Sequence, residues 1–116
     1  MAQSLTNLTV FNESRALLRS VRKCACNARG FGDLAKQLER AAISVASNIA
    51  EGAGSGSDRK FAYFLRIARG SVNEVEAQLL LLTDIGKLAP DHAAIADANL
   101  LGRRLTCFIK RLEEGG

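Results

Sequence analysis

The residues of this chain that could do chemistry are few. The only histidine is His92, and the three cysteines are Cys24, Cys26 and Cys107. A zinc site needs paired Cys or His ligands at defined spacings, and a nucleophilic Ser or Cys needs a base within reach. A single histidine does not meet these needs, and an odd cysteine count argues against a disulfide framework. We therefore expect a non-enzymatic protein with no metal, no cofactor and reduced, inert thiols, with His92 on the surface.

A glycine-rich segment at residues 52–56 resembles a phosphate-binding loop in composition alone. A phosphate loop follows a strand and ends in Gly-Lys-Ser or Gly-Lys-Thr, whereas this segment follows a helical pattern and lacks that ending. Glycine is also the usual residue of tight corners. The segment is therefore predicted to be a corner between two helices.

A more distinctive pattern is a polar set that shares one helical face, at spacings i, i+4, i+8 and i+11. Its members are Arg40, Ser44, Asn48 and Glu51. Folding the next helix back about the glycine corner brings Arg40 level with Gly70, Ser71 and Glu74. We expect Gly70 to let the helices approach closely and Arg40 to pair with Glu74. Such a network can fix which helix faces meet; a ligand or catalytic site is the alternative.

The positive charge is concentrated near the start of the chain. The formal net charge of the whole chain is +4, and residues 1–30 alone hold five cations against one acid. Helical spacing places the cations of this first segment on one face of a helix. The last predicted helix, adjacent to the first in an up-down-up-down bundle, adds further cations to the same surface. The candidate basic strip consists of Arg15, Arg19, Arg22, Lys23, Arg103, Arg104, Lys110 and Arg111.

Two interpretations of this strip remain open. Clustered Lys and Arg residues attract the phosphate backbone of nucleic acid without regard to its sequence. Alternatively, the strip is an ordinary solvated surface whose late cations suit the helix dipoles. Base-specific recognition is not predicted, because the chain has only five Phe and one Tyr and none interleaves with these charges.

The hydrophobic periodicity that must position these residues is helical throughout. Apolar residues recur every three or four positions in four segments, which predicts helices over 10–28, 33–53, 58–86 and 91–113. A chain of 116 residues can bury one core, so we expect a single domain over residues 1–116. Short connections make sequential helices antiparallel neighbours. The predicted fold is all-α, an up-down-up-down four-helix bundle.

The predicted helix ends follow from local chemistry. Gly30 and Gly32 should end the first helix and Gly86 the third, since glycine readily adopts the left-handed conformation of a C-terminal cap. Asp33 should cap the second helix, and Ser57 or Asp58 the third. Pro90 is expected at the first turn of the fourth helix, where proline is tolerated.

One segment is apolar in every direction around its helix. It consists of Leu79, Leu80, Leu81 and Leu82. A single bundle core cannot cover all sides of such a run. Burial by loops and neighbouring helices is one explanation; we favour the other, a subunit interface in a homo-oligomer, because exposed leucine runs are avoided.

The chain has no basic and apolar start typical of a secretory signal, and no run of roughly 18 apolar residues that would span a membrane. We therefore expect a cytoplasmic protein with no membrane contact.

Two stretches resemble a known bacterial family. Residues 37–52, QLERAAISVASNIAEG, and residues 64–74, FLRIARGSVNE, are similar to hallmark motifs of the 23S ribosomal RNA-intervening sequence proteins, the S23 family. The family usually has a proline before the second helix, where this chain has residues 30–33, GFGD. The resemblance covers the middle of the chain.

The resemblance implies a four-helix bundle that assembles as a ring-like homopentamer, without enzymatic activity. It also relates the chain to accessory proteins of diversity-generating retroelements, which bind nucleic acid and a reverse transcriptase. Two functions are carried forward: an oligomeric accessory protein that holds RNA or DNA on its basic strip, or a protein-interaction scaffold with no nucleic-acid role. The sequence does not choose between RNA and DNA.

Overall fold

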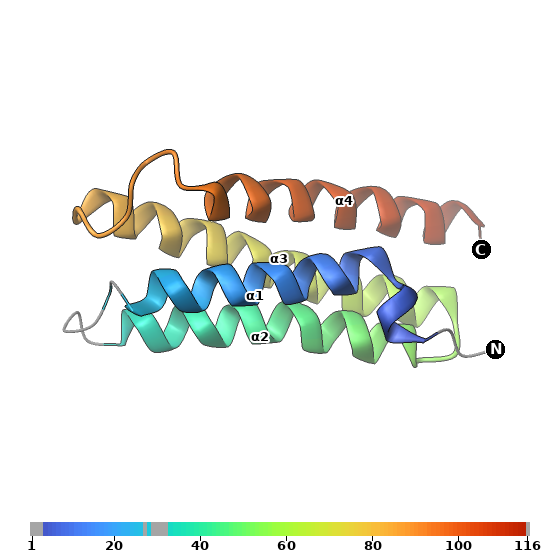
Figure 1. Cartoon of the computed structure of the whole chain (residues 1–116). Helices are drawn as coiled ribbons and strands as arrows, with labels where there is room; N and C mark the ends of the chain where they lie inside the picture. The colour runs from blue at the N-terminus through green and yellow to red at the C-terminus, as the bar shows by residue number, and fades with distance from the viewer. Residues whose placement is uncertain (1–3, 27, 29–32, 116) are drawn as a thin grey trace.

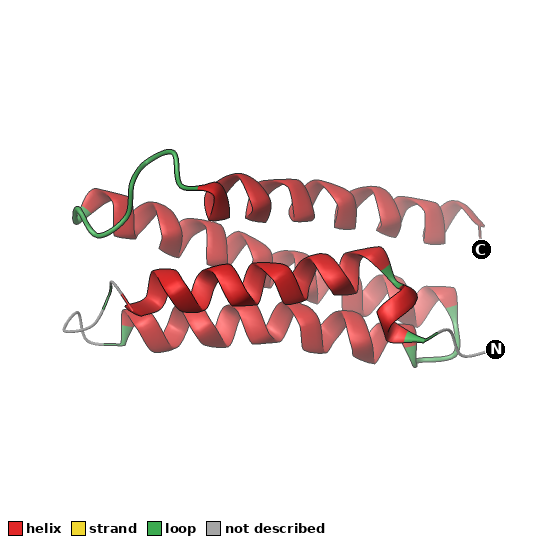
Figure 2. Cartoon of the chain, viewed as in Figure 1, coloured by secondary structure: helices red, strands yellow, loops and turns green. Residues whose placement is uncertain are grey.

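Four amphipathic segments form the helices of this protein. The computed structural model describes residues 4–26, 28 and 33–115, and this part of the chain contains helices and no strands (Figure 2). A short 3₁₀ helix, η1 (Leu5–Asn7), precedes α1 (Thr9–Cys26), α2 (Leu34–Ala53), α3 (Asp58–Asp84) and α4 (Ala93–Gly115). The prediction of an all-helical fold with four helices is confirmed.

The chain reverses direction at each connection, so that sequential helices are antiparallel (Figure 1). α2 and α3 form the most extensive contact, followed by α3 with α4 and α1 with α2. α1 and α4 close the bundle with the least extensive of these contacts. The result is a rod of 45 × 20 × 19 Å.

The core contains the apolar residues of the four periodic stripes. Its largest fully buried side chains are Leu38, Ile49, Leu65, Leu79, Leu82, Leu101, Leu105, Val21, Val45, Val72, Val75 and Cys24. Truncating one such leucine to alanine typically costs about 2–5 kcal/mol of folding free energy, because the neighbours only partly fill the space. Tertiary packing along these stripes therefore sustains helices that propensity alone would not.

Two of the predicted helix ends are present as expected. The Ser57 hydroxyl accepts a hydrogen bond from the Lys60 backbone N–H at 3.2 Å and caps α3. α3 ends before Gly86, which has a φ of +74°, and the Lys87 N–H donates to the Leu82 carbonyl at 2.8 Å. A left-handed residue at this point is what glycine tolerates best.

Other predicted ends differ from the structure. Asp33 precedes α2, but its side chain makes no capping hydrogen bond, and Gly30 and Gly32 lie outside the described residues. α4 begins at Ala93 rather than at residue 91, so Pro90 lies in the preceding turn. His92 takes the capping role, because its Nδ1 accepts the Ala94 N–H at 3.1 Å.

Close approach of α2 and α3 depends on a different glycine from the one predicted. A Cβ atom at Gly70 would have nothing within 4 Å, so Gly70 faces open space. A Cβ atom at Gly52 would lie 2.8 Å from Phe61 Cδ1 and 3.2 Å from the Phe61 carbonyl oxygen. Gly52 is therefore the residue whose missing side chain lets the two helices meet at the corner. The prediction for Gly70 was wrong because Gly70 lies on an exposed side of α3.

Candidate nucleic-acid interface

The cations of the first helix form an exposed set that we call the α1 patch. It consists of Arg15, Arg19, Arg22 and Lys23, all exposed on α1. Arg15 donates to Asn12 Oδ1 at 3.2 Å, and its guanidinium lies 6.0 Å from the centre of the Phe11 ring. The other three make no hydrogen bond or ion pair with the described part of the chain. Their charge is therefore available to an outside anion.

The cations of the last helix form a second set, the α4 patch. It consists of Arg103, Arg104, Lys110 and Arg111, again all exposed. Arg104 Nε donates to Glu13 Oε2 at 3.0 Å, which ties α4 to α1 and partly neutralises one member. Arg111 lies with its guanidinium 5.4 Å from the centre of the Phe108 ring. An arginine beside an aromatic ring offers a flat cationic surface.

The two patches do not form the single continuous strip that the sequence suggested. Because α1 and α4 are antiparallel, Glu13 lies beside Arg104, while Cys24 lies beside His92. With about 1.5 Å of rise per residue, Arg111 is level with η1, just before α1 begins, whereas Lys23 is level with the first turn of α4. The patches are therefore offset along the rod and come level only in the middle of the helices.

Between the first turn of α1 and residues 100–111 of α4 lies a hollow that the sequence did not predict, here called the α1–α4 groove. Its volume is about 410 Å³. Apolar side chains of Val10, Leu100 and Phe108 and the arginines Arg103, Arg104 and Arg111 line it. Leu100 is 39% exposed and lies off the buried stripe of α4, next to buried Leu101. A leucine outside the buried stripe was the feature of the sequence that could have indicated the groove.

Beyond Leu100 the same seam becomes acidic. Glu13 and Asp97 line a smaller hollow of about 160 Å³ together with Leu100. Glu13 Oε1 is buried there without a hydrogen-bond partner, while Oε2 holds Arg104. The positive charge of the groove is therefore limited to the part lined by the arginines of the α4 patch. The carboxylates would direct an anion toward these arginines and away from Asp97.

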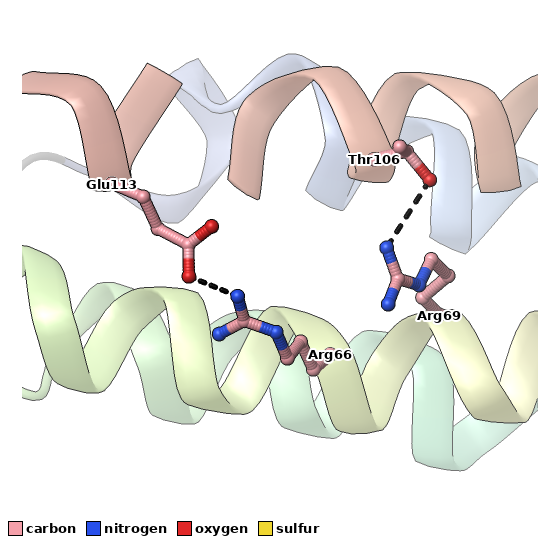
Figure 3. Close-up of polar contacts among 4 residues, drawn as sticks. All are labelled: Arg66, Arg69, Thr106 and Glu113. Carbon is pink, nitrogen blue, oxygen red and sulfur yellow. Dashed lines mark hydrogen bonds and ion pairs between the residues drawn. The ribbon is translucent and has the colours of Figure 1, made fainter. Parts of the chain in front are cut away.

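Two arginines of α3, Arg66 and Arg69, are engaged within the molecule instead. Figure 3 shows Arg66 pointing from α3 to Glu113 on α4, with which it forms an ion pair. Arg69 extends to the Thr106 hydroxyl of α4, to which it donates at 3.4 Å. Because the Arg66 charge is already paired, the α3–α4 seam presents less free positive charge than α1 and α4 do.

The polar network predicted between α2 and α3 is partly present. The hydroxyls of Ser44 and Ser71 lie 2.9 Å apart, and Asn48 Nδ2 donates to the Ser44 carbonyl at 2.9 Å and to the Ser44 hydroxyl at 3.1 Å. These half-buried groups satisfy one another across the seam. These hydrogen bonds join α2 to α3 at this point of the seam.

The charged members of that network are not joined to it. The described residues form no ion pair between Arg40 and Glu74, so the prediction of this pair was wrong. Glu74 instead accepts from Gln78 Nε2 at 3.4 Å, and Glu51 is exposed without a partner. Exposed Lys or Arg gains little by pairing with a carboxylate, because water screens both charges.

The leucine run divides between the core and the surface. Leu79 and Leu82 are fully buried within their own bundle, so neither belongs to an exposed interface. Leu80 and Leu81 are 46% and 52% exposed. Leu81 shares its face of α3 with Tyr63, which precedes it by 18 residues, because five helical turns contain 18 residues.

Among the described residues, one of the three thiols lies against the histidine. Cys24, Cys26 and Cys107 are free, and Cys24 is buried while the other two are exposed. Burial raises the pKa of the Cys24 thiol, which disfavours the thiolate, and a backbone hydrogen bond offsets this only in part. Its Sγ lies 3.9 Å from Nε2 of His92, which is half-buried rather than on the surface as expected. We interpret the pair as a packing contact at the start of α4.

Within the described residues, no group of three or more His, Cys, Asp or Glu side chains could hold a metal ion. None of the helices in this part of the chain is long and apolar enough to cross a membrane.

The fold and this surface define a four-helix bundle protein with exposed basic patches on its first and last helices. The family model of the 23S rRNA-intervening sequence protein matches residues 6–105, and the chain belongs to this family. A crystal structure of a protein with unknown function from the S23 ribosomal protein family of Bacteroides thetaiotaomicron VPI-5482 is similar, with a TM-score of 0.79 and 22% sequence identity. The match covers 88% of this chain and 96% of that one, and at this identity it shows a shared fold. No protein of curated function matches the chain.

Proposed function

We propose that this chain is a non-enzymatic, self-associating protein that binds nucleic acid through the α1 and α4 patches. The observation that carries the proposal is the exposure of all eight patch cations. Phosphate groups of RNA and DNA displace their bound counterions when such cations approach, and the released ions drive binding. The expected binding is therefore strong at low salt and indifferent to base sequence. The expectation that no aromatic residue interleaves with these cations was wrong, because Phe11 lies beside Arg15 and Phe108 beside Arg111, but stacking on such rings does not depend on base identity.

Catalysis is not part of the proposal. A reactive cysteine needs a lowered pKa and access to solvent, whereas Cys24 is buried and its pKa is raised. The α4 patch instead combines long cationic side chains with a hollow, which suits a ligand that is held and not converted.

Self-association is supported by exposed apolar side chains near the two ends of one side of α3, a set that we call the α3 stripe. It consists of Tyr63, Ile67 and Leu81, which lie on one side of the helix, and Ile85 just past its end; all four are exposed, and Glu74 lies between the two pairs. Gly70 lies on the same side, with open space around it. A second copy of the chain could cover this stripe, and the homopentamer implied by the family resemblance would repeat both basic patches five times around one particle.

Charge reversal tests the nucleic-acid proposal. The variant Arg15→Glu/Arg19→Glu/Arg22→Glu should bind labelled RNA and DNA more weakly, and the slope of log affinity against log salt should fall by roughly 0.7–0.9 per lost phosphate contact. The control Lys36→Glu/Arg59→Glu/Lys60→Glu carries the same change of net charge at exposed positions outside the patches. It should retain both affinity and slope. Equal losses in the two variants would show that net charge and not the patches matters.

An absence of binding in the unmodified protein would reject this function. Recovery of one specific protein partner from nuclease-treated extract, with no oligonucleotide bound at low salt, would instead favour the interaction scaffold.

A further inference from the structure

The α1–α4 groove combines two surfaces that a purely phosphate-binding protein does not need together. Its lining combines apolar side chains of Val10, Leu100 and Phe108, which we call its floor, with arginines of the α4 patch, which we call its rim. Its volume of about 410 Å³ lies within the roughly 300–1,000 Å³ of small-molecule sites. α1 and α4 contact each other less extensively than the three pairs of sequential helices do, and the hollow lies between them.

The charge of the groove selects for an anion. Its lining includes Arg103, Arg104 and Arg111 and no carboxylate. Glu13 approaches from the side and accepts from Arg104 Nε. Arg103 makes no hydrogen bond or ion pair with the described residues, which leaves its charge available to a ligand.

The floor requires more of the ligand than charge. A duplex shows its phosphates outside and keeps the flat faces of its bases stacked inside, so it would contact the rim and leave the floor wet. An unpaired nucleotide offers a flat, largely apolar ring beside a phosphate. Bases of single strands stack on aromatic rings and arginine planes without regard to sequence. Phe108, half-buried, and Arg111 next to its ring provide such a surface.

We propose that the α1–α4 groove accepts an unpaired base of single-stranded nucleic acid, while the arginines of its rim hold the adjacent phosphates. This inference rests on the proposed function and deepens it, because it names single strands as the preferred class of nucleic acid. The base lies on the floor near Leu100 and Phe108, and the strand leaves toward Lys110 because Glu13 and Asp97 repel phosphate at the other end.

The test compares three labelled probes by fluorescence anisotropy: a single-stranded oligonucleotide, the same strand with abasic sites throughout, and its duplex. The variant Leu100→Ser removes part of the apolar floor without changing charge. Leu100 would bury its exposed apolar surface against the base, and because that is only part of a leucine side chain, the variant should weaken single-strand binding by about fivefold. Its duplex affinity should change less than twofold. Leu80→Ser, at a leucine of similar exposure on α3, is the matched control and should leave all three affinities unchanged.

The outcomes separate this inference from the function on which it rests. If the abasic strand and the duplex bind as tightly as the intact strand, and Leu100→Ser has no effect, the groove takes no base while phosphate binding survives. If none of the probes binds at low salt, both proposals fall. An acidic amphipathic peptide that binds in a Leu100-dependent manner, when the oligonucleotides do not, would assign the groove to a protein partner and overturn the inference.

Discussion

The hydroxyls of Ser44 and Ser71 lie 2.9 Å apart across the α2–α3 seam, one from each stretch that resembles the family motifs. Asn48 donates to the Ser44 hydroxyl as well, so one small polar group joins two helices. A half-buried pair of hydroxyls has few other partners, and it therefore specifies how the two helices meet along their length.

Removing either hydroxyl should destabilise the fold by about 1 kcal/mol, because the other loses its partner. We expect Ser44→Ala and Ser71→Ala together to cost less than the sum of the single changes in urea unfolding, which is the signature of direct coupling. Ser47→Ala, at an exposed position of α2, is the control. Strictly additive losses would show that the hydroxyls do not interact.

The two glycines of the α2–α3 pair should respond in opposite directions. Gly52→Ala should lower the free energy of unfolding by about 1–3 kcal/mol, since the added Cβ would meet Phe61. Gly70→Ala should raise it by about 0.5–1 kcal/mol, because alanine favours helix and the site is open. Thermal unfolding of dilute protein measures both. A larger loss at Gly70 than at Gly52 would contradict the assigned packing.

Neighbouring leucines of α3 provide a test of self-association. Leu81→Glu places a charge on the α3 stripe and should dissociate the assembly, as seen by light scattering. Leu80→Glu introduces the same change about 100° around the helix and should leave the particle mass unchanged. A monomeric parent protein, or equal dissociation by both variants, would reject the α3 stripe as the contact.

The free energy of unfolding should fall at alkaline pH because the buried Cys24 thiol resists ionisation in the folded state. Burial raises the pKa of this thiol in the folded state, so the unfolded chain loses its proton first. The protonated thiol contributes fully to the free energy of unfolding below about pH 8.5, the ordinary thiol pKa. This contribution is lost as pH rises through the folded pKa, and the free energy of unfolding then falls by up to about 1.4 kcal/mol per pH unit. Cys24→Ala should reduce this dependence in urea titrations from pH 7 to pH 10. Cys107→Ala, at an exposed thiol, should preserve it, and an unchanged dependence in Cys24→Ala would contradict the assignment.

The helices were predictable because their signal is local. Apolar spacing identifies the stripe of each helix, and the Ser57 cap and Gly86 turn depend on residues close in sequence. The start of α4 was missed because a histidine, His92, caps it in place of the usual Ser, Thr, Asp or Asn.

The candidate site was less predictable because it depends on register and spacing between helices. Helical periodicity groups Arg15 with Arg19, but only the antiparallel register of α1 and α4 shows that Lys23 and Arg111 lie far apart along the rod. The groove likewise arises where two helices fail to pack closely. A one-dimensional pattern contains neither the interhelical distance nor the side chains that fill it.

The central claim is that the protein forms a particle of several subunits and that the basic patches of α1 and α4 on this particle bind nucleic acid. A salt titration of the purified protein with mixed RNA and DNA, with light scattering on the same sample, tests it most directly. We expect log affinity to fall linearly with log salt, with a slope of roughly −3 or steeper, as four or more phosphate contacts require. No binding at low salt, or binding that salt does not weaken, would contradict the account and leave both patches as solvated helix surface.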